Sequence, residues 1–272
     1  MAEMWDSVAS GWERNAQFVD AHIAPATELL LDEATIGPGD RVLDLATGPG
    51  GAGVAAAERV GDGGRVVLAD VAGEMVAAAG RRTADDPRIT TLVCDQMAID
   101  APDESFDAVI VRHGLMFAED PVAAVREAAR VLRSGRRYAA MTWDRRDANP
   151  WLGVTLDAVS EHIGAPVPPP GIRGPFSLDE PDLLVAAFGD AGLEDVRART
   201  VATPMTAASL EDWWDRVLAL AGPLAVVLAN MEPEARAAVR ERALRLGEAA
   251  ARRTGDGITL AGSVIVASGR RA

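Results

Sequence analysis

The chain has 272 residues, 27 basic and 41 acidic side chains, and a net charge of −14. This length suits one large α/β domain with an appended cap, and the 49% of apolar residues predict a folded core. No residue is a lysine, which excludes a lysine Schiff base and the lysine of a phosphate-binding P-loop. The acidic balance disfavours nucleic acid as a partner, because a phosphate backbone would be repelled.

The sequence also bears on metal binding and location. Cys94 is the single cysteine and there are three histidines, so no Cys/His cluster for zinc is expected and no metal is predicted. The first residues lack the basic start and apolar run of a secretory signal. The longest uncharged stretch, 217–231, is broken by Gly222-Pro223 and is shorter than the roughly 20 residues of a membrane span. We therefore expect a cytoplasmic protein with no membrane span.

Between Arg41 and Trp143, short β-rich runs alternate with alanine-rich segments that have helical spacing. The predicted strands are 41–46, 65–70, 89–95, 107–113 and 136–143, and the predicted helices are 53–60, 74–82 and 121–132. Strand, helix and strand repeated in this way predict right-handed crossovers and an α/β fold. The sheet should be doubly wound and mostly parallel, with helices on both faces.

The alternation ends after Trp143. Further on, we expect a helix over 181–191, a strand over 194–203, a surface helix over 232–253 and a last strand over 258–268. A further helix should begin at a capping box formed by Ser209 and Asp212, and it carries Trp213 and Trp214. The two late strands bring the sheet to seven. The predicted organisation is a helical cap over 1–40, a ligand-binding α/β core over 41–143, helical lid segments over 144–257 interrupted by the core strand 194–203, and a final strand and tail over 258–272.

Ligands of such sheets bind beyond the carboxyl ends of the strands. The predicted strands place ionisable residues there: Asp44, Asp70, Asp95, Arg112 and His113. We therefore expect these side chains to meet at one crevice.

The first strand is followed by a glycine-rich turn over 44–53. Gly48, Gly50 and Gly53 satisfy the G-x-G-x-x-G dinucleotide fingerprint, and Asp70 follows at the distance of its ribose-binding acid. An NAD(P)-dependent oxidoreductase is therefore one alternative. Pro49 argues against it, because proline removes an N–H group from the loop that would hold a pyrophosphate.

Charge also separates the two interpretations of this turn. Asp44 precedes the glycines and Asp95 ends the third strand. Acids at these places disfavour a pyrophosphate and favour a cation. Together with Asp70, they describe a ligand that has a ribose and an amino group but no phosphate.

Five ordered motifs over roughly 5–143 resemble class I S-adenosylmethionine-dependent methyltransferases, and most of all the branch that includes the ubiquinone/menaquinone-biosynthesis C-methyltransferases. The motifs are Asp44-x-Ala-x-Gly48-x-Gly50-Gly51, Asp70, Cys94-Asp95-Gln96-Met97, Pro102-Asp103-x-Ser105-Phe106-Asp107 and Arg130-Val-Leu-Arg-Ser-Gly135. Two residues depart from the pattern of the family: Ala46 stands for its first loop glycine, and Ser134 for its proline. The resemblance implies the Rossmann-like methyltransferase fold and is weak over 144–257, where substrate is chosen.

Carried over by position, the resemblance implies a set of S-adenosylmethionine contacts. The glycine loop would wrap the methionine part of the cofactor, and Asp70 would bind the ribose hydroxyls. Asp95, Gln96 and Met97 would contact the adenine edge. The segment from Trp5 to Trp12 would close over the cofactor. The implied cofactor residues are Trp12, Asp44, Ala46, Thr47, Gly48, Gly50, Asp70, Val71, Met75, Asp95, Gln96, Met97 and Arg112.

The roles of several side chains stay open in the sequence. Asp44 could touch the ligand or only orient the loop, and Arg112 could bind a carboxylate or form a structural bridge with Asp44, which we slightly prefer. His113 is the candidate catalytic base, because imidazole titrates near neutral pH, although a histidine of the site wall is an equal alternative. His22 is the second candidate. Tryptophans such as Trp143 could line an apolar pocket.

The expected function is S-adenosylmethionine-dependent transfer of a methyl group, to carbon or oxygen, of a small and fairly apolar molecule. A protein that binds the cofactor without methylating, as a cyclase or regulatory module, is the alternative from another class. The expected partners are the methyl acceptor and, as an open alternative, a second copy of the chain in a homodimer.

Overall fold

The computed structural model describes residues 1–255 and 257–272 and contains a seven-stranded sheet. Its strands are β1 (Arg41–Leu45), β2 (Arg65–Asp70), β3 (Ile89–Val93), β4 (Phe106–Arg112), β5 (Leu132–Trp143), β6 (Glu194–Ala202) and β10 (Ser263–Arg270). They lie in the order β3-β2-β1-β4-β5-β10-β6, and β10 runs antiparallel to both of its neighbours. The prediction of a mostly parallel, doubly wound sheet is confirmed.

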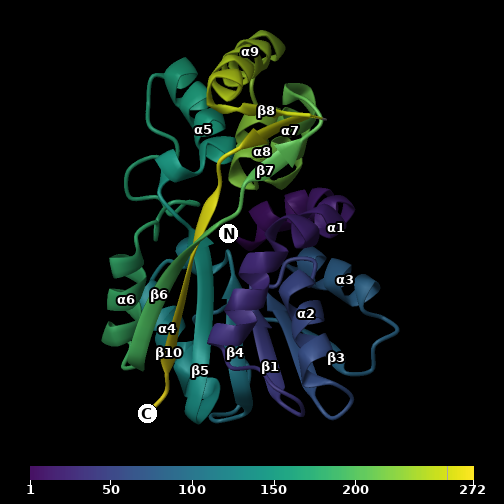
Figure 1. Cartoon of the computed structure of the whole chain (residues 1–272), viewed down its shortest axis with the longest axis vertical. Helices are drawn as coiled ribbons and strands as arrows, with labels where there is room; N and C mark the ends of the chain where they lie inside the picture. The colour runs from purple at the N-terminus through teal and green to yellow at the C-terminus, as the bar shows by residue number, and fades with distance from the viewer. Residues whose placement is uncertain (256) are drawn as a thin grey trace.

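Helices cover both faces of this sheet (Figure 1). One face packs against α1 (Ala2–Glu33), α2 (Gly51–Val60) and α3 (Gly73–Arg82) through a core of small and branched side chains. The other face packs against α4 (Pro121–Val131) and α6 (Pro181–Asp190), with the short turn η1 (Leu115–Phe117) beside them. Burial on both faces explains why the strands are almost wholly apolar up to their last residues.

A second group of elements lies beyond the carboxyl ends of the parallel strands, at the top of Figure 1. It consists of η2 (Arg146–Ala148), α5 (Pro150–Ile163), α7 (Leu210–Leu220), α8 (Pro223–Ala229), α9 (Pro233–Ala250) and a small sheet of β7 (Met205–Ala207), β9 (Gly257–Leu260) and β8 (Arg252–Thr254). These elements share their own apolar core, in which Trp213 and Trp214 are both buried. The predicted capping box is present, since Ser209 Oγ accepts a 3.2 Å bond from the N–H of Asp212.

Two late elements differ from the sequence prediction. The single strand expected over 258–268 is two strands, β9 and β10, in different sheets. They separate at Gly262, where a Cβ would lie 2.1 Å from the carbonyl oxygen of Thr203. The helix expected over 232–253 ends at Ala250, because Arg252 and Arg253 pair with β9. Glu248, in the last turn of the helix, forms an ion pair with Arg253.

Helix α1 belongs to both parts of the molecule. Its first half lies between the cap and the sheet, and its second half runs down one sheet face (Figure 1). The second half ends at Glu33, a buried carboxylate that accepts 2.7 Å bonds from both Ser268 Oγ and Arg197 Nε. The far end of α1 is thus fixed to the sheet.

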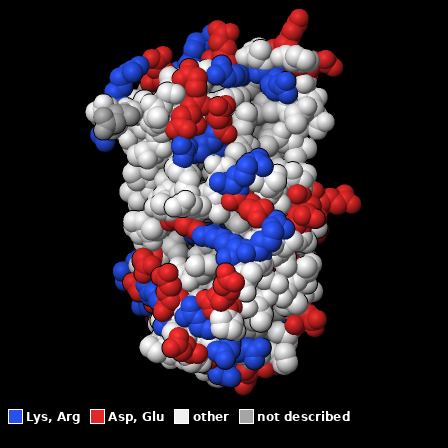
Figure 2. All heavy atoms as spheres, turned by 90° about the vertical axis from the view of Figure 1, so that its right-hand side faces the viewer, with Lys and Arg blue, Asp and Glu red and all other residues white. Residues whose placement is uncertain are grey.

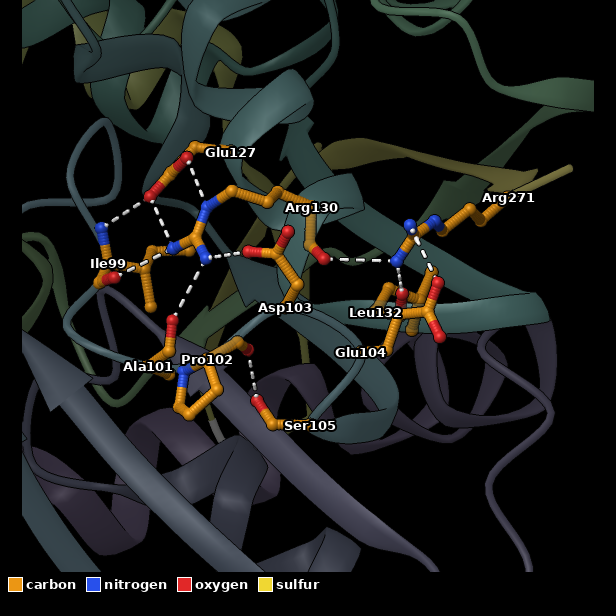
Figure 3. Close-up of polar contacts among 10 residues, drawn as sticks. All are labelled: Ile99, Ala101, Pro102, Asp103, Glu104, Ser105, Glu127, Arg130, Leu132 and Arg271. Carbon is orange, nitrogen blue, oxygen red and sulfur yellow. Dashed lines mark hydrogen bonds and ion pairs between the residues drawn. The ribbon is translucent and has the colours of Figure 1, made fainter.

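Two of the motifs that resemble the family serve the scaffold. Arg130 at the end of α4 donates to Glu127, to Asp103 and to the carbonyl oxygens of Ala101 and Ile99 (Figure 3). In the same view, Arg271 donates to the Arg130 carbonyl oxygen at 3.0 Å and to Glu104 at 3.1 Å. These bonds tie the loop before β4 to the end of α4 and to the C-terminal segment.

Candidate active site

The carboxyl ends of β1, β2, β4 and β5 bring the predicted site residues to one edge of the sheet, below the cap (Figure 1). The backbone of the glycine loop takes three left-handed conformations there, at Ala46 (φ 52°), Gly48 (φ 54°) and Gly50 (φ 88°). Such φ values are costly for alanine and free of penalty for glycine. Ala46, which replaces the usual glycine, is therefore accommodated at a cost in strain.

Asp70 organises this loop. Its Oδ2 accepts the backbone N–H of Gly48 at 2.9 Å, and its Oδ1 accepts that of Ala72 at 3.0 Å. The side chain is 7% exposed, and burial raises its pKa, while the backbone donors lower it. Since each carboxylate oxygen has a further lone pair, Asp70 retains capacity for ligand hydroxyls.

Asp44 is fully buried beside the same loop. One carboxylate oxygen accepts the Thr47 hydroxyl at 2.6 Å, and the other, Oδ1, finds no hydrogen-bond partner among the described residues. Burial raises the pKa of Asp44 to about 6, against the lowering effects of Thr47 and Arg112. A cationic or hydrogen-donating ligand group at Oδ1 would relieve this cost.

Arg112 does not pair with Asp44, so the preferred structural bridge is wrong. Its guanidinium donates instead to Asp20 of α1 at 2.9 Å and to the Thr27 hydroxyl at 3.2 Å. Asp20 is the site residue that the sequence prediction missed. It carries no local signal, because it lies in the middle of a helix and its partner is 92 residues away.

The residues after β3 form the next wall. Asp95 is exposed and its Oδ1 accepts the backbone N–H of Met97 at 2.8 Å, which closes a tight turn. Gln96 is partly buried and donates from Nε2 to the carbonyl oxygen of Gly114 at 3.2 Å. Gly114 lies against Ala46, since a Cβ on Gly114 would be 2.2 Å from the Cβ of Ala46. Gln96 therefore lies close to the glycine loop.

The first half of α1 covers the crevice beside β2. Trp12 packs in a small apolar cluster with Ala72 and with Met75, which is 2% exposed, next to the partly buried Val71. Trp5 in the same cluster contacts Phe117 edge to face at 5.1 Å. The helix thus brings an aromatic lid against the segment that follows Asp70.

The two candidate bases lie on the cap side of the site. His113 stacks on Trp143 with ring centroids 3.9 Å apart, and its φ of 61° is in the left-handed region. Burial first, and then Arg112 and His22, lower the pKa of His113 well below 6.5. His22 stacks on Phe18 at 5.6 Å, and burial lowers its pKa to about 4. Both imidazoles are neutral at physiological pH.

Unpartnered polar atoms test whether these residues fit the implied cofactor and acceptor. The buried side-chain atoms that find no partner within 1–255 and 257–272 include six on the predicted site residues: Trp12 Nε1, His22 Nε2, Asp44 Oδ1, Gln96 Oε1, His113 Nδ1 and His113 Nε2. Buried polar groups are normally satisfied, so such a cluster indicates a ligand with donors and acceptors. The mixture suits a molecule that carries ammonium, amino and hydroxyl groups.

Two further properties of the described residues bear on the site. They contain no group of three or more His, Cys, Asp or Glu side chains arranged to hold a metal ion. No helix over the same residues is both long and apolar enough to cross a membrane.

The sequence is similar to known methyltransferases. Residues 42–135 match the family described as "Methyltransferase domain". The ubiquinone/menaquinone biosynthesis C-methyltransferase UbiE of Xanthomonas oryzae pv. oryzae is 34% identical over 161 residues, which are 58% of this chain and 63% of that protein. The chain therefore spans less than two thirds of the length of this relative.

Solved structures share the fold. A putative methyltransferase from Bacillus halodurans has a TM-score of 0.59 at 18% identity, over 90% of this chain and 98% of that one. The [4+2]-cyclase SpnF has a TM-score of 0.56 at 19% identity, over 91% of this chain and 80% of that one.

The seven-stranded sheet and the match over 42–135 together indicate a methyltransferase domain in this part of the chain. Over 161 residues this part of the chain is similar to the ubiquinone/menaquinone biosynthesis C-methyltransferases. The resemblance stated from the motifs is confirmed, and the match favours it over the dinucleotide alternative.

Proposed function

We propose that the protein transfers a methyl group from S-adenosylmethionine to oxygen or carbon of a small, fairly apolar acceptor. The observation that carries this proposal is the cluster of six unpartnered buried polar atoms in a methyltransferase domain. When bound, S-adenosylmethionine supplies an electrophilic methyl group on a sulfonium centre. The protein then needs chiefly to align the acceptor and exclude water.

The cofactor residues are proposed by position and by their free bonding capacity. Asp70 accepts the ribose hydroxyls with the lone pairs that the loop leaves free, and Asp95, Gln96 and Met97 border the adenine. Asp44 offers Oδ1 to the positively charged part of the ligand. The rest of the surface comes from the glycine loop and from the lid: Ala46, Thr47, Gly48, Gly50, Val71, Met75, Trp12 and Arg112.

The acceptor lies, in this proposal, between the cap and the end of β4. Trp143 stacks on His113 and meets Trp151 edge to face at 4.9 Å, and α1 contributes Phe18 and His22, whose rings stack on each other. Flat apolar walls with unpartnered ring nitrogens favour a flat molecule that bears a hydroxyl or enol group.

His113 is proposed to accept the proton or hydrogen bond of the acceptor. The neutral imidazole has the free lone pair that this requires. Because its pKa is lowered well below 6.5, it is a weak base and suits acceptors that are themselves acidic. It orients the nucleophile first and removes the proton as the new bond forms.

The weak basicity of both imidazoles is also the observation that favours the second candidate, a protein that binds S-adenosylmethionine without methylating. Such a protein needs no proton acceptor beside the sulfonium. A cytoplasmic location and a homodimer remain predictions from the sequence under either function.

A labelled-methyl screen separates these candidates. The protein is incubated with trideuteromethyl S-adenosylmethionine and a panel of phenols, enolisable ketones, carboxylic acids and amines, and products are detected by mass spectrometry. The proposal expects a three-deuterium methyl on oxygen or carbon of at least one acidic acceptor. Tight cofactor binding with no labelled product over the whole panel would support the non-methylating candidate.

A further inference from the structure

Asp20, in the middle of α1, holds two arginines from different elements. Its Oδ1 accepts from Arg112, at the end of β4, at 2.9 Å, and its Oδ2 accepts from Arg82 in the last turn of α3. Arg82 also reaches the carbonyl oxygen of Pro49, within the glycine loop, at 3.4 Å. One carboxylate thus connects α1, β4, α3 and the cofactor loop.

The absence of a side chain at Gly51 leaves the space that the Asp20 carboxylate occupies. Gly51 is the first residue of α2, and a Cβ there would lie 1.9 Å from Asp20 Oδ1 and 2.4 Å from Arg112 Nη2. Its φ is not among the positive values of the chain, so the backbone conformation does not require glycine. Glycine is required because the side chains of Asp20 and Arg112 fill the space that a Cβ would take.

The other polar contacts between α1 and α3 are more exposed. Glu13 pairs with Arg81 at side-chain exposures of 38% and 57%, whereas Asp20 and its partner Arg82 in α3 are 26% and 29% exposed and its partner Arg112 in β4 is 9% exposed. Exposed ion pairs contribute little to stability, so Asp20 is the stronger attachment. The first half of α1 packs in a small apolar cluster around Ala9 and against the cap, where Gly11 lies against Ala219 of α7 and Trp5 against Gly222.

We propose that Asp20 is a positioning residue that, through Arg112 and the space at Gly51, fastens the lid half of α1 to the glycine loop and slows release of the cofactor. The identity of the ligand in this inference rests on the proposed function. Phe18 and His22 lie two residues before and after Asp20, so the same attachment positions the acceptor wall on α1.

The test measures S-adenosylhomocysteine dissociation by stopped-flow tryptophan fluorescence, with affinity from calorimetry. Asp20→Ala and Gly51→Ala are each expected to raise Kd about tenfold, mainly through faster dissociation, and Asp20→Asn by less, because it keeps a hydrogen-bond acceptor. The double variant should bind S-adenosylhomocysteine no more weakly than either single variant, because both substitutions remove the same contact between α1 and the glycine loop. Glu13→Gln, on the same helix, is the matched control and should stay within about twofold.

Amide hydrogen exchange without ligand provides an independent readout. Exchange over 2–19 should quicken in Asp20→Ala and Gly51→Ala and stay unchanged in Glu13→Gln. Wild-type dissociation and exchange rates in both Asp20 variants would overturn the inference, as would additive effects of Asp20→Ala and Gly51→Ala. If the wild-type protein fails to bind S-adenosylhomocysteine, the proposed function fails, and the exchange measurement still decides the role of Asp20.

Discussion

The backbone N–H of Gly48 donates a 2.9 Å hydrogen bond to Oδ2 of Asp70, which joins the glycine loop after β1 to the end of β2. The other oxygen of Asp70 accepts the N–H of Ala72. This carboxylate therefore shapes the loop before it meets any ligand. Ligand binding and loop conformation are linked through one side chain.

Asp70→Ala should weaken S-adenosylhomocysteine binding by about 1–3 kcal/mol, because a charged hydrogen-bond partner is lost and the Gly48 N–H is released. Calorimetric titration measures the change. Asp85→Ala, an equal loss of charge at an exposed position, is the control. Unchanged affinity in Asp70→Ala would rule out the ribose contact.

Replacing His113 should lower turnover far more than cofactor affinity. Asparagine is the preferred replacement, because the φ of 61° at this position is tolerated better by asparagine than by alanine. Turnover and S-adenosylhomocysteine affinity are measured with any acceptor found in the screen, and His162→Asn, at an exposed position, serves as the control. Full turnover of His113→Asn with every accepted acceptor would remove His113 from catalysis.

Asp44 should make the stability of the ligand-free protein depend on pH. Its pKa is raised to about 6 in the folded protein, so between pH 4 and 6 the folded state keeps a proton that the unfolded state releases. Stability from this group is present below pH 4 and is lost as pH rises through 6, by about 3 kcal/mol in total.

Asp44→Asn cannot titrate and keeps an acceptor for the Thr47 hydroxyl. Its free energy of unfolding should therefore rise relative to wild type between pH 4.5 and 7, as urea unfolding would measure. A difference between the two proteins that is constant over this range would contradict the raised pKa of Asp44.

Arg130→Gln should affect the scaffold and leave the site intact. The loss of its bonds to Glu127, Asp103 and two carbonyl oxygens (Figure 3) should lower the free energy of unfolding by about 1–3 kcal/mol. Arg126→Gln, on the same helix with one 3.5 Å bond to a carbonyl oxygen, is the control. A fall in S-adenosylhomocysteine affinity that parallels the loss of stability would show that this motif serves binding.

The sheet could be predicted because its signals are local. The apolar runs end in polar residues at the crevice edge, and the turn after Leu45 contains glycines at two of its three positive φ values, Gly48 and Gly50. The small sheet of the cap could not be predicted. Arg252 and Arg253 continue a helical pattern, and only their pairing with β9 makes them a strand.

The site shows the same division. Asp44, Asp70 and His113 lie at or next to the carboxyl ends of strands and could be placed from the sequence, whereas the partner of Arg112 could not. Asp20 reaches it across 92 residues, from a helix whose orientation is set by packing on the sheet.

Basic and acidic side chains are mixed on one face of the molecule. On the face shown in Figure 2, basic side chains lie beside acidic ones and do not form one continuous basic band. The face therefore lacks the pattern that would track a phosphate backbone.

The most direct test is isothermal titration of the protein with S-adenosylmethionine, S-adenosylhomocysteine and NADH. We predict micromolar binding of the first two and no binding of NADH. Binding of NADH alone would contradict the account and return Gly48, Gly50 and Gly53 to the dinucleotide interpretation.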